Sequence, residues 1–146
     1  MTFHYIEFKA YCHATENLDK VKEAIENLAG RELELEISDA EGYYGNPIKI
    51  LEGKISKNKE MDHFFDNLPE KIIQRLKCDV DKRIDERCNF FFRINKSEAY
   101  EEELELTKGG NSIRIRARVE SYPAKKETAV EKMKEYLSKL EVRSEG

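Results

Sequence analysis

The sequence has no tryptophan, only three cysteines and no long apolar run, and each scarcity narrows what the chain can be. No apolar stretch approaches the roughly 20 residues that a membrane-spanning helix needs. The first residues, MTFHYIEFK, have no apolar block of the kind that a signal peptide carries. Cys12, Cys78 and Cys88 are odd in number and form no CxxC pair, as expected for reduced thiols. We therefore expect a cytoplasmic location and no membrane partner.

Catalytic motifs are missing as well. The sequence contains no HExxH zinc motif, no Walker A loop and no GxSxG nucleophile elbow. His4, Cys12 and His13 could in principle approach a metal, but Cys12 and His13 are neighbours on a predicted strand and point to opposite faces. We expect no catalytic residues, no bound metal and no cofactor, and hence a protein that is not an enzyme.

What the sequence does contain is charge, unevenly distributed. Lys and Arg number 26 and Asp and Glu number 30, for a net charge of −4. Residues 16–41 carry an excess of Asp and Glu, whereas residues 48–59 and 108–126 carry an excess of Lys and Arg. A local positive field can therefore exist on a chain that is acidic on average. Its length of 146 residues and its 39% hydrophobic content predict one domain over residues 1–146 with one core.

The periodicity of apolar residues predicts an α+β fold. Clean alternation of apolar and polar residues favours an antiparallel sheet with helices packed on one face. The predicted strands span residues 3–12, 32–38, 48–57, 89–96, 101–106 and 112–121. The predicted helices span residues 18–28, 60–77, 81–87 and 124–140.

Local signals refine these elements. Either Thr15 or Asn17 caps the first helix, and Gly30 ends it. Pro69 either starts a second helix or kinks the one over residues 60–77. In the segment ELELEIS, residues 32–38, the alternation predicts that Leu33, Leu35 and Ile37 point inward. Gly53 marks a bulge or a close approach of backbone.

The stretch IRIRARV, residues 113–119, places three arginines on one strand face. A two-residue hairpin turn at Gly109 and Gly110 would align this strand with the glutamate-rich segment 101–106. In that register Arg114, Arg116 and Arg118 lie opposite Glu105, Glu103 and Glu101. The arginines then form a cross-strand ion-pair face. The alternative is that they hold a nucleic-acid phosphate backbone.

Cations and aromatics elsewhere predict contacts with RNA. Lys125 and Lys126 open the last helix, where free N–H groups favour a phosphate, and tyrosine or histidine rings can stack on bases. The candidate RNA-binding residues are Lys9, His13, Tyr43, Lys49, Lys54, Lys57, Arg93, Lys96, Arg114, Arg116, Lys125 and Lys126. The rings available for stacking are those of Tyr11, His13 and Tyr43. For every cation the alternative is an ordinary solvated side chain. The sequence does not match the aromatic signature of an RRM, and the segment GYYGNP at 42–47, although it contains GxxG, is interpreted as a turn and not as a KH clamp.

Three segments together resemble a known family. They are FHYIEFKAYCHATE at 3–16, EGYYGNPIKILEGKI at 41–55 and YPAKKE at 122–127. In these HYI…CHATE, GxxGNPI and YPAK elements the chain resembles the archaeal RNA-binding proteins associated with the exosome. The resemblance implies a single α+β domain similar to the ribosomal protein that binds 5S rRNA, or to a double-stranded-RNA-binding domain. It also implies a non-catalytic role with RNA, beside the exosome.

Two functions of different class follow. The first is an accessory RNA-binding protein that contacts mainly the phosphate backbone and the shape of its RNA. The second is a protein-interaction module whose acidic segment 16–41 docks a basic partner such as an exosome subunit, without direct contact to RNA. The sequence does not determine an oligomeric state.

Overall fold

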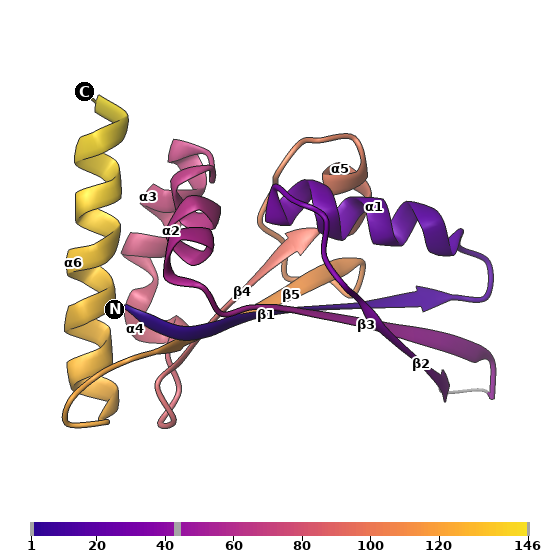
Figure 1. The fold of residues 1–146 in the computed structure, drawn as a ribbon, viewed down its shortest axis with the longest axis horizontal. Coiled ribbons are helices and arrows are strands. Elements are labelled where there is room, and N and C mark those ends of the chain that lie inside the picture. The colour runs from indigo at the N-terminus through magenta and orange to yellow at the C-terminus, as the bar shows by residue number, and fades with distance from the viewer. Residues whose placement is uncertain (1, 43–44, 146) are drawn as a thin grey trace. The chain divides into compact units, whose positions relative to one another are not determined.

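The structure, a computed structural model, describes residues 2–42 and 45–145, with side chains as far as Leu140. It is an α+β fold whose five strands form one antiparallel sheet in the order β2-β3-β1-β5-β4, as the sequence predicts. The strands are β1 (Phe3–His13), β2 (Glu36–Glu41), β3 (Pro47–Ile55), β4 (Asn89–Asn95) and β5 (Ser112–Val119). The helices are α1 (Leu18–Ala29), α2 (Asn58–Asp66), α3 (Glu70–Cys78), α4 (Val80–Arg83), α5 (Lys96–Tyr100) and α6 (Lys126–Glu145) (Figure 1).

The chain folds into two compact units, each built from several segments. Unit 1 comprises residues 1–6, 55–92 and 116–146, and unit 2 comprises residues 7–54 and 93–115. Strands β1, β3, β4 and β5 contribute residues to both units. In each unit taken separately, the helices lie on one side of its strands (Figure 1). The assignment of residues 1–146 to one domain stays a prediction.

The core of unit 1 is aromatic. Phe3 of β1 stacks on Phe65 of α2 with ring centroids 5.0 Å apart, and Phe64 stacks on Phe92 of β4 at 6.4 Å. The hydroxyl of Tyr136 on α6 donates to a carboxylate oxygen of Asp62 at 2.8 Å. Burial of such rings supplies the largest hydrophobic stabilisation per residue, so α2 and α6 are fixed to their strands.

Helix boundaries follow the sequence signals. Asn17, rather than Thr15, caps α1, because its Oδ1 accepts from the N–H groups of Asp19 and Lys20 at 2.9 and 3.2 Å. Gly30 ends α1 in the left-handed region at φ 74°. Pro69 separates two helices, α2 and α3, instead of kinking one.

In unit 2, the segment ELELEIS departs from its predicted pattern. The strand begins only at Glu36, and Ile37 is 46% exposed. Leu33 and Leu35 precede the strand and pack against Gly53 of β3, where an added Cβ would lie 2.8 Å from Leu35 Cδ2 and 3.3 Å from Leu33 Cδ1. Gly53 is therefore a site of close approach by two side chains, whereas the sequence predicted a bulge or a close approach of backbone. Alternation predicted Ile37 to point inward, but alternation alone cannot show how far along a strand the side chains that bury it extend.

The predicted hairpin at Gly109 and Gly110 is wrong. Strand β5 lies between β1 and β4, and the glutamate-rich segment runs along β4 instead. Leu106 bridges Ile94 of β4, the N–H of Asn95 donates to Glu105 O at 2.8 Å, and the N–H of Thr107 donates to Arg93 O at 3.0 Å. The reason is α5, which was not predicted. Asn95 caps it through Glu98 N–H at 2.9 Å, so the chain turns back along β4.

Candidate nucleic-acid interface

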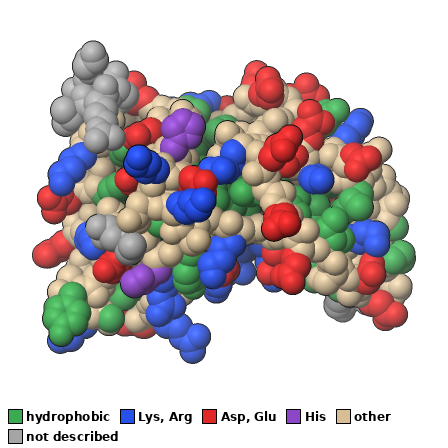
Figure 2. Space-filling model, in the orientation of Figure 1, with side chains coloured by type: hydrophobic (Ala, Val, Ile, Leu, Met, Phe, Trp, Pro, Cys, Tyr) green, Lys and Arg blue, Asp and Glu red, His purple; other side chains and the backbone are tan. Residues whose placement is uncertain are grey.

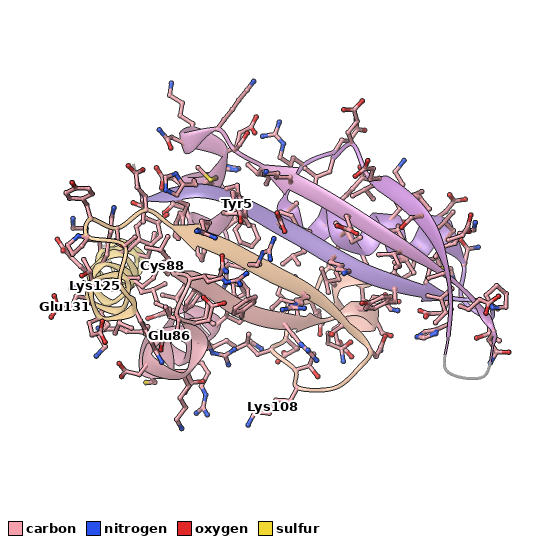
Figure 3. The ribbon with its side chains drawn as sticks, turned by 90° about the horizontal axis from the view of Figure 1, so that it is seen from below. Tyr5, Glu86, Cys88, Lys108, Lys125 and Glu131 are labelled. Atoms are coloured by element: carbon pink, nitrogen blue, oxygen red, sulfur yellow. The ribbon has the colours of Figure 1, made fainter. Side chains whose placement is uncertain are left out.

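In the part of the chain that the structure describes, one side of each unit's strands has no helix over it (Figure 1 and Figure 3). Burial alternates along β1 in unit 2: Phe8, Ala10 and Cys12 are buried, while Lys9 is half-buried and Tyr11 is exposed. Figure 3 looks onto this helix-free side. Since successive side chains on a strand point to opposite faces, the polar set on β1 lies on the open side.

Neighbouring strands add cations to the open face of unit 2. We use this name for Lys9 and His13 of β1, Lys54 of β3, Arg93 of β4 and Arg114 of β5, all placed there by the burial of their neighbours. Glu7 of β1 and Glu52 of β3 have the same strand parity as the cations of those strands, and Glu105 lies on the segment that runs along β4. Five predicted site residues thus share one side of one unit, among carboxylates that reduce the local potential.

Tyr11 lies near the end of the middle strand, because β1 stands between β3 and β5 in the sheet. Its side chain is 43% exposed, and Lys9 Nζ lies 5.7 Å from the centroid of its ring. A cation at this distance is attracted to the negative face of the ring. The pair therefore presents an aromatic surface and a positive charge together.

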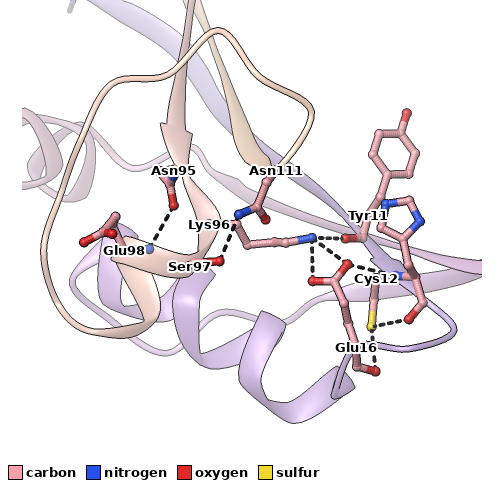
Figure 4. A network of polar contacts seen from close by, with 9 residues as sticks. Tyr11, Cys12, Glu16, Asn95, Lys96, Ser97, Glu98 and Asn111 are labelled. Atoms are coloured by element: carbon pink, nitrogen blue, oxygen red, sulfur yellow. Dashed lines mark hydrogen bonds and ion pairs between the residues drawn. The ribbon is translucent and has the colours of Figure 1, made fainter.

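The backbone beneath Tyr11 is held by a buried lysine. Lys96, 4% exposed, donates from Nζ to Tyr11 O at 2.7 Å and to Glu16 Oε1 and Oε2 at 3.0 and 2.9 Å. Glu16 Oε1 also accepts from the N–H of His13 at 3.2 Å. Figure 4 shows the Tyr11 ring pointing away from this network. Lys96 was predicted to contact RNA, but its ammonium group is enclosed and already neutralised.

The network shifts two ionisations. Burial by itself would raise the pKa of Glu16, but the hydrogen bonds from Lys96 and from His13 N–H, with the charge of Lys96, lower that pKa below its usual value. Burial, together with the charge of Glu16, raises the pKa of the Cys12 thiol. The CHATE segment, residues 12–16, therefore has a structural explanation: Glu16 ties the end of β1 to α5.

The open side of unit 1 carries a second cation–aromatic pair. Arg116 of β5 lies with Cζ 5.9 Å from the ring centroid of Tyr5 on β1, which Figure 3 labels. Arg118, two residues on, faces Asp85. Burial would raise the pKa of Asp85, but hydrogen bonds from Asn89 and from Arg87 N–H, and the charge of Arg118, lower it below its usual value.

The remaining predicted cations lie elsewhere. Lys57 precedes α2, and Lys125 and Lys126 stand at the start of α6, all three in unit 1. Lys125 and Lys126 follow Tyr122, whose side chain is 99% exposed. Lys49 of β3 lies on the opposite side from Lys54 and bonds to Asp39 Oδ1 at 2.7 Å. Tyr43 lies outside the described residues.

The face of the molecule seen in Figure 2 mixes both signs of charge. Figure 2 shows Lys and Arg side chains interspersed with Asp and Glu, the acidic ones prominent over α1 and α5. Within residues 2–42 and 45–145, no group of three His, Cys, Asp or Glu side chains could hold a metal ion. In the same ranges no helix has both the length and the apolarity to cross a bilayer. All three cysteines are free, with only Cys78 exposed.

The list of predicted residues omits Tyr5 and Arg118. Both share strand parity with residues on that list: Tyr5 with Lys9, and Arg118 with Arg114 and Arg116. Parity could therefore have placed them on the open side. It could not show the separate positions of Lys49 and Lys96, which depend on tertiary contacts.

An α+β fold with an open sheet side of cations and tyrosines defines a class of binding protein, and comparison with known proteins names the family. The chain belongs to a family of RNA-binding proteins, because the family model described as "RNA binding" matches residues 5–119. It is 32% identical over 143 residues to the RNA-binding protein PAB1135 of Pyrococcus abyssi, an alignment that covers 92% of this chain and 93% of that one.

Two solved structures share this fold throughout. Mth689 of Methanothermobacter thermautotrophicus, a DUF54 protein, is 33% identical with a TM-score of 0.82, covering 94% of this chain and 99% of that one. AF2318 of Archaeoglobus fulgidus is 35% identical, with the same TM-score and the same coverage. The resemblance to an RNA-binding family is thus confirmed over nearly the whole chain.

Proposed function

We propose that this chain is a non-catalytic RNA-binding protein that holds the phosphate backbone of its RNA on the open face of unit 2. Family membership supports RNA as the partner. The single structural observation that supports the site is the grouping of Lys9, Lys54, Arg93 and Arg114 on one side of the strands, which follows from the burial of their neighbours. Phosphate contacts by Lys and Arg supply most of the sequence-independent affinity of a nucleic-acid-binding protein.

The nearby carboxylates limit this affinity. Glu7 and Glu52 stand beside the cations, so each phosphate contact competes with an intramolecular attraction. We therefore expect moderate binding that weakens strongly with salt, by 10-fold or more between roughly 50 and 200 mM if several phosphates are engaged.

A charge-reversal experiment tests the site. Lys9→Glu combined with Lys54→Glu should lower affinity for RNA at least about 10-fold at low salt and make the salt dependence shallower, because two phosphate contacts are lost. Fluorescence anisotropy with a labelled RNA measures both quantities, and circular dichroism checks the fold. A second variant, Lys125→Glu with Lys126→Glu, measures any separate contribution from the YPAK segment.

The matched control reverses two exposed lysines on helices. Lys22 on α1 and Lys82 on α4 are exposed, so Lys22→Glu with Lys82→Glu changes the net charge equally. If this control weakens RNA binding as much as the Lys9 and Lys54 variant, binding follows net charge and the proposed site is wrong.

We also propose association with the archaeal exosome in RNA processing, with a cytoplasmic location. Its support is the family resemblance in the HYI…CHATE, GxxGNPI and YPAK elements. The exposed acidic residues of segment 16–41 would suit a basic partner, which keeps the protein-interaction module as the second candidate. Recovery of exosome subunits with the tagged chain after nuclease treatment would favour a direct protein contact. Recovery only before such treatment would favour an RNA bridge.

A further inference from the structure

We infer that the open face of unit 2 selects unpaired RNA, because Tyr11 provides a platform on which one base stacks. This inference rests on the proposed function and specifies the class of RNA that it concerns. Its starting point is the contrast between Tyr11 and the aromatic rings that build the core. The side chains of Phe8, Phe90 and Phe92 are almost fully buried, whereas Tyr11 is 43% exposed on a strand inside the sheet.

The position of the ring is fixed from below. Lys96 Nζ donates to the main-chain carbonyl of Tyr11 at 2.7 Å, and Glu16 neutralises that ammonium group at 2.9 Å. Figure 4 shows the ring directed away from these groups. A base that stacks on Tyr11 would therefore meet a ring on an ordered strand, which lowers the conformational entropy lost on binding.

Cations lie close to the Tyr11 ring and on the neighbouring strands, where they could bind the phosphates of a stacked nucleotide. Lys9 Nζ is 5.7 Å from the ring centroid, His13 is exposed two residues farther along the same strand, and Lys54 and Arg114 stand on the strands on either side. A nucleotide with its base on Tyr11 would have the Lys9 ammonium beside it, and Lys54 and Arg114 on the neighbouring strands would be available to the phosphates of adjacent nucleotides. Aromatic rings beside such cations are the pattern by which proteins bind single strands.

Geometry excludes a paired base from the same position. Inside a duplex each base is covered on both faces by its neighbours and offers only its edge and its phosphates. A tyrosine on a sheet can stack only on a base whose face is exposed, as in a single strand, a loop or an end. The cations alone would not distinguish the two forms, so selectivity depends on Tyr11.

The test compares two RNAs and three tyrosine variants by fluorescence anisotropy. The probes are a labelled oligouridine of about 12 nucleotides and a labelled duplex of about 16 base pairs. Tyr11→Leu should weaken binding of the single strand roughly 5- to 100-fold and leave duplex binding nearly unchanged. Tyr11→Phe keeps the ring and should bind almost as the parent does. Neither change removes the carbonyl that Lys96 requires.

The matched control is Tyr100→Leu. Tyr100 lies on α5 with Lys20 Nζ 5.3 Å from its ring, so it is a second tyrosine–lysine pair of unit 2, on a helix. This variant should bind both RNAs as the parent does, with thermal unfolding checked for all variants.

Each outcome has a defined meaning. If Tyr11→Leu binds oligouridine as well as the parent, or if the parent prefers the duplex, base stacking at Tyr11 is wrong. If, in addition, Lys9→Glu with Lys54→Glu still weakens binding, the proposed function survives without the stacking site. If the parent binds neither RNA at low salt, both proposals fail.

Discussion

At the scale of single residues, the most consequential position is Lys96, a charged group in a buried site. A buried ammonium is tolerated only when its charge is neutralised and its protons are bonded. Glu16 and the carbonyl of Tyr11 meet both conditions. Removal of one partner leaves the other desolvated and unpaired, which costs more than the pair contributes.

Lys96→Met should lower the free energy of unfolding by about 2 kcal/mol, because Glu16 is partly exposed and water recovers some of the loss. Urea denaturation measures the change. Lys49→Met is the control: Lys49 and Asp39 form an exposed pair, so its loss should cost under about 1 kcal/mol. Equal effects of the two substitutions would contradict the structural role given to Lys96.

Glu16 gives the network a dependence on pH. Its pKa is lowered in the folded chain, so its contribution to stability is present above the unfolded pKa, near 4.3, and is lost as pH falls through the lower folded value. Glu16→Gln should therefore be less stable than the parent at pH 7, and the difference should shrink below about pH 4.5. Urea titrations across this range measure it. A difference that does not vary with pH would exclude ionisation as its cause.

At the scale of elements, the sequence predicted helix boundaries correctly where the interacting residues are close to one another in the chain. Asn17, Gly30 and Pro69 set helix boundaries through bonds or backbone conformations within a few residues, and the sequence predicts them. The hairpin failed because its register depends on α5, a short helix with little apolar periodicity. Lys96 was misplaced for the same reason, since its burial arises from Tyr11 and Glu16, about 80 residues away in sequence.

Gly53 offers a test at this scale. Gly53→Ala should lower the free energy of unfolding by about 1–2 kcal/mol, because the new methyl group would displace the ends of Leu33 and Leu35. Gly110→Ala is a matched control, since nothing lies within 4 Å of the Cβ it would add. Thermal or urea unfolding of the two variants measures the difference. If both changes had the same effect on stability, the contacts of Leu33 and Leu35 at position 53 would not be the reason for a glycine there.

At the scale of the whole molecule, strand parity proved more informative than charge counts. The pattern of alternation correctly predicts the α+β class. In the structure, the burial of neighbouring residues then places Lys9, Lys54, Arg93 and Arg114 on one side. Net charge could not do so, since acidic residues are interleaved along the same strands. The division into two units also has no signal in the composition, because each unit is assembled from segments far apart in the chain.

Strand β2 has a consequence for the behaviour of the protein in concentrated solution. It is an outer strand of the sheet that pairs, among described residues, with β3 alone, and Ile37 on it is 46% exposed. An unpaired strand margin is a template for self-association. Glu36 and Glu41 place negative charge there, so two copies of this margin repel each other. Substitution of Glu36 and Glu41 by uncharged residues would remove this repulsion, which makes the margin of β2 the natural starting point for precipitation.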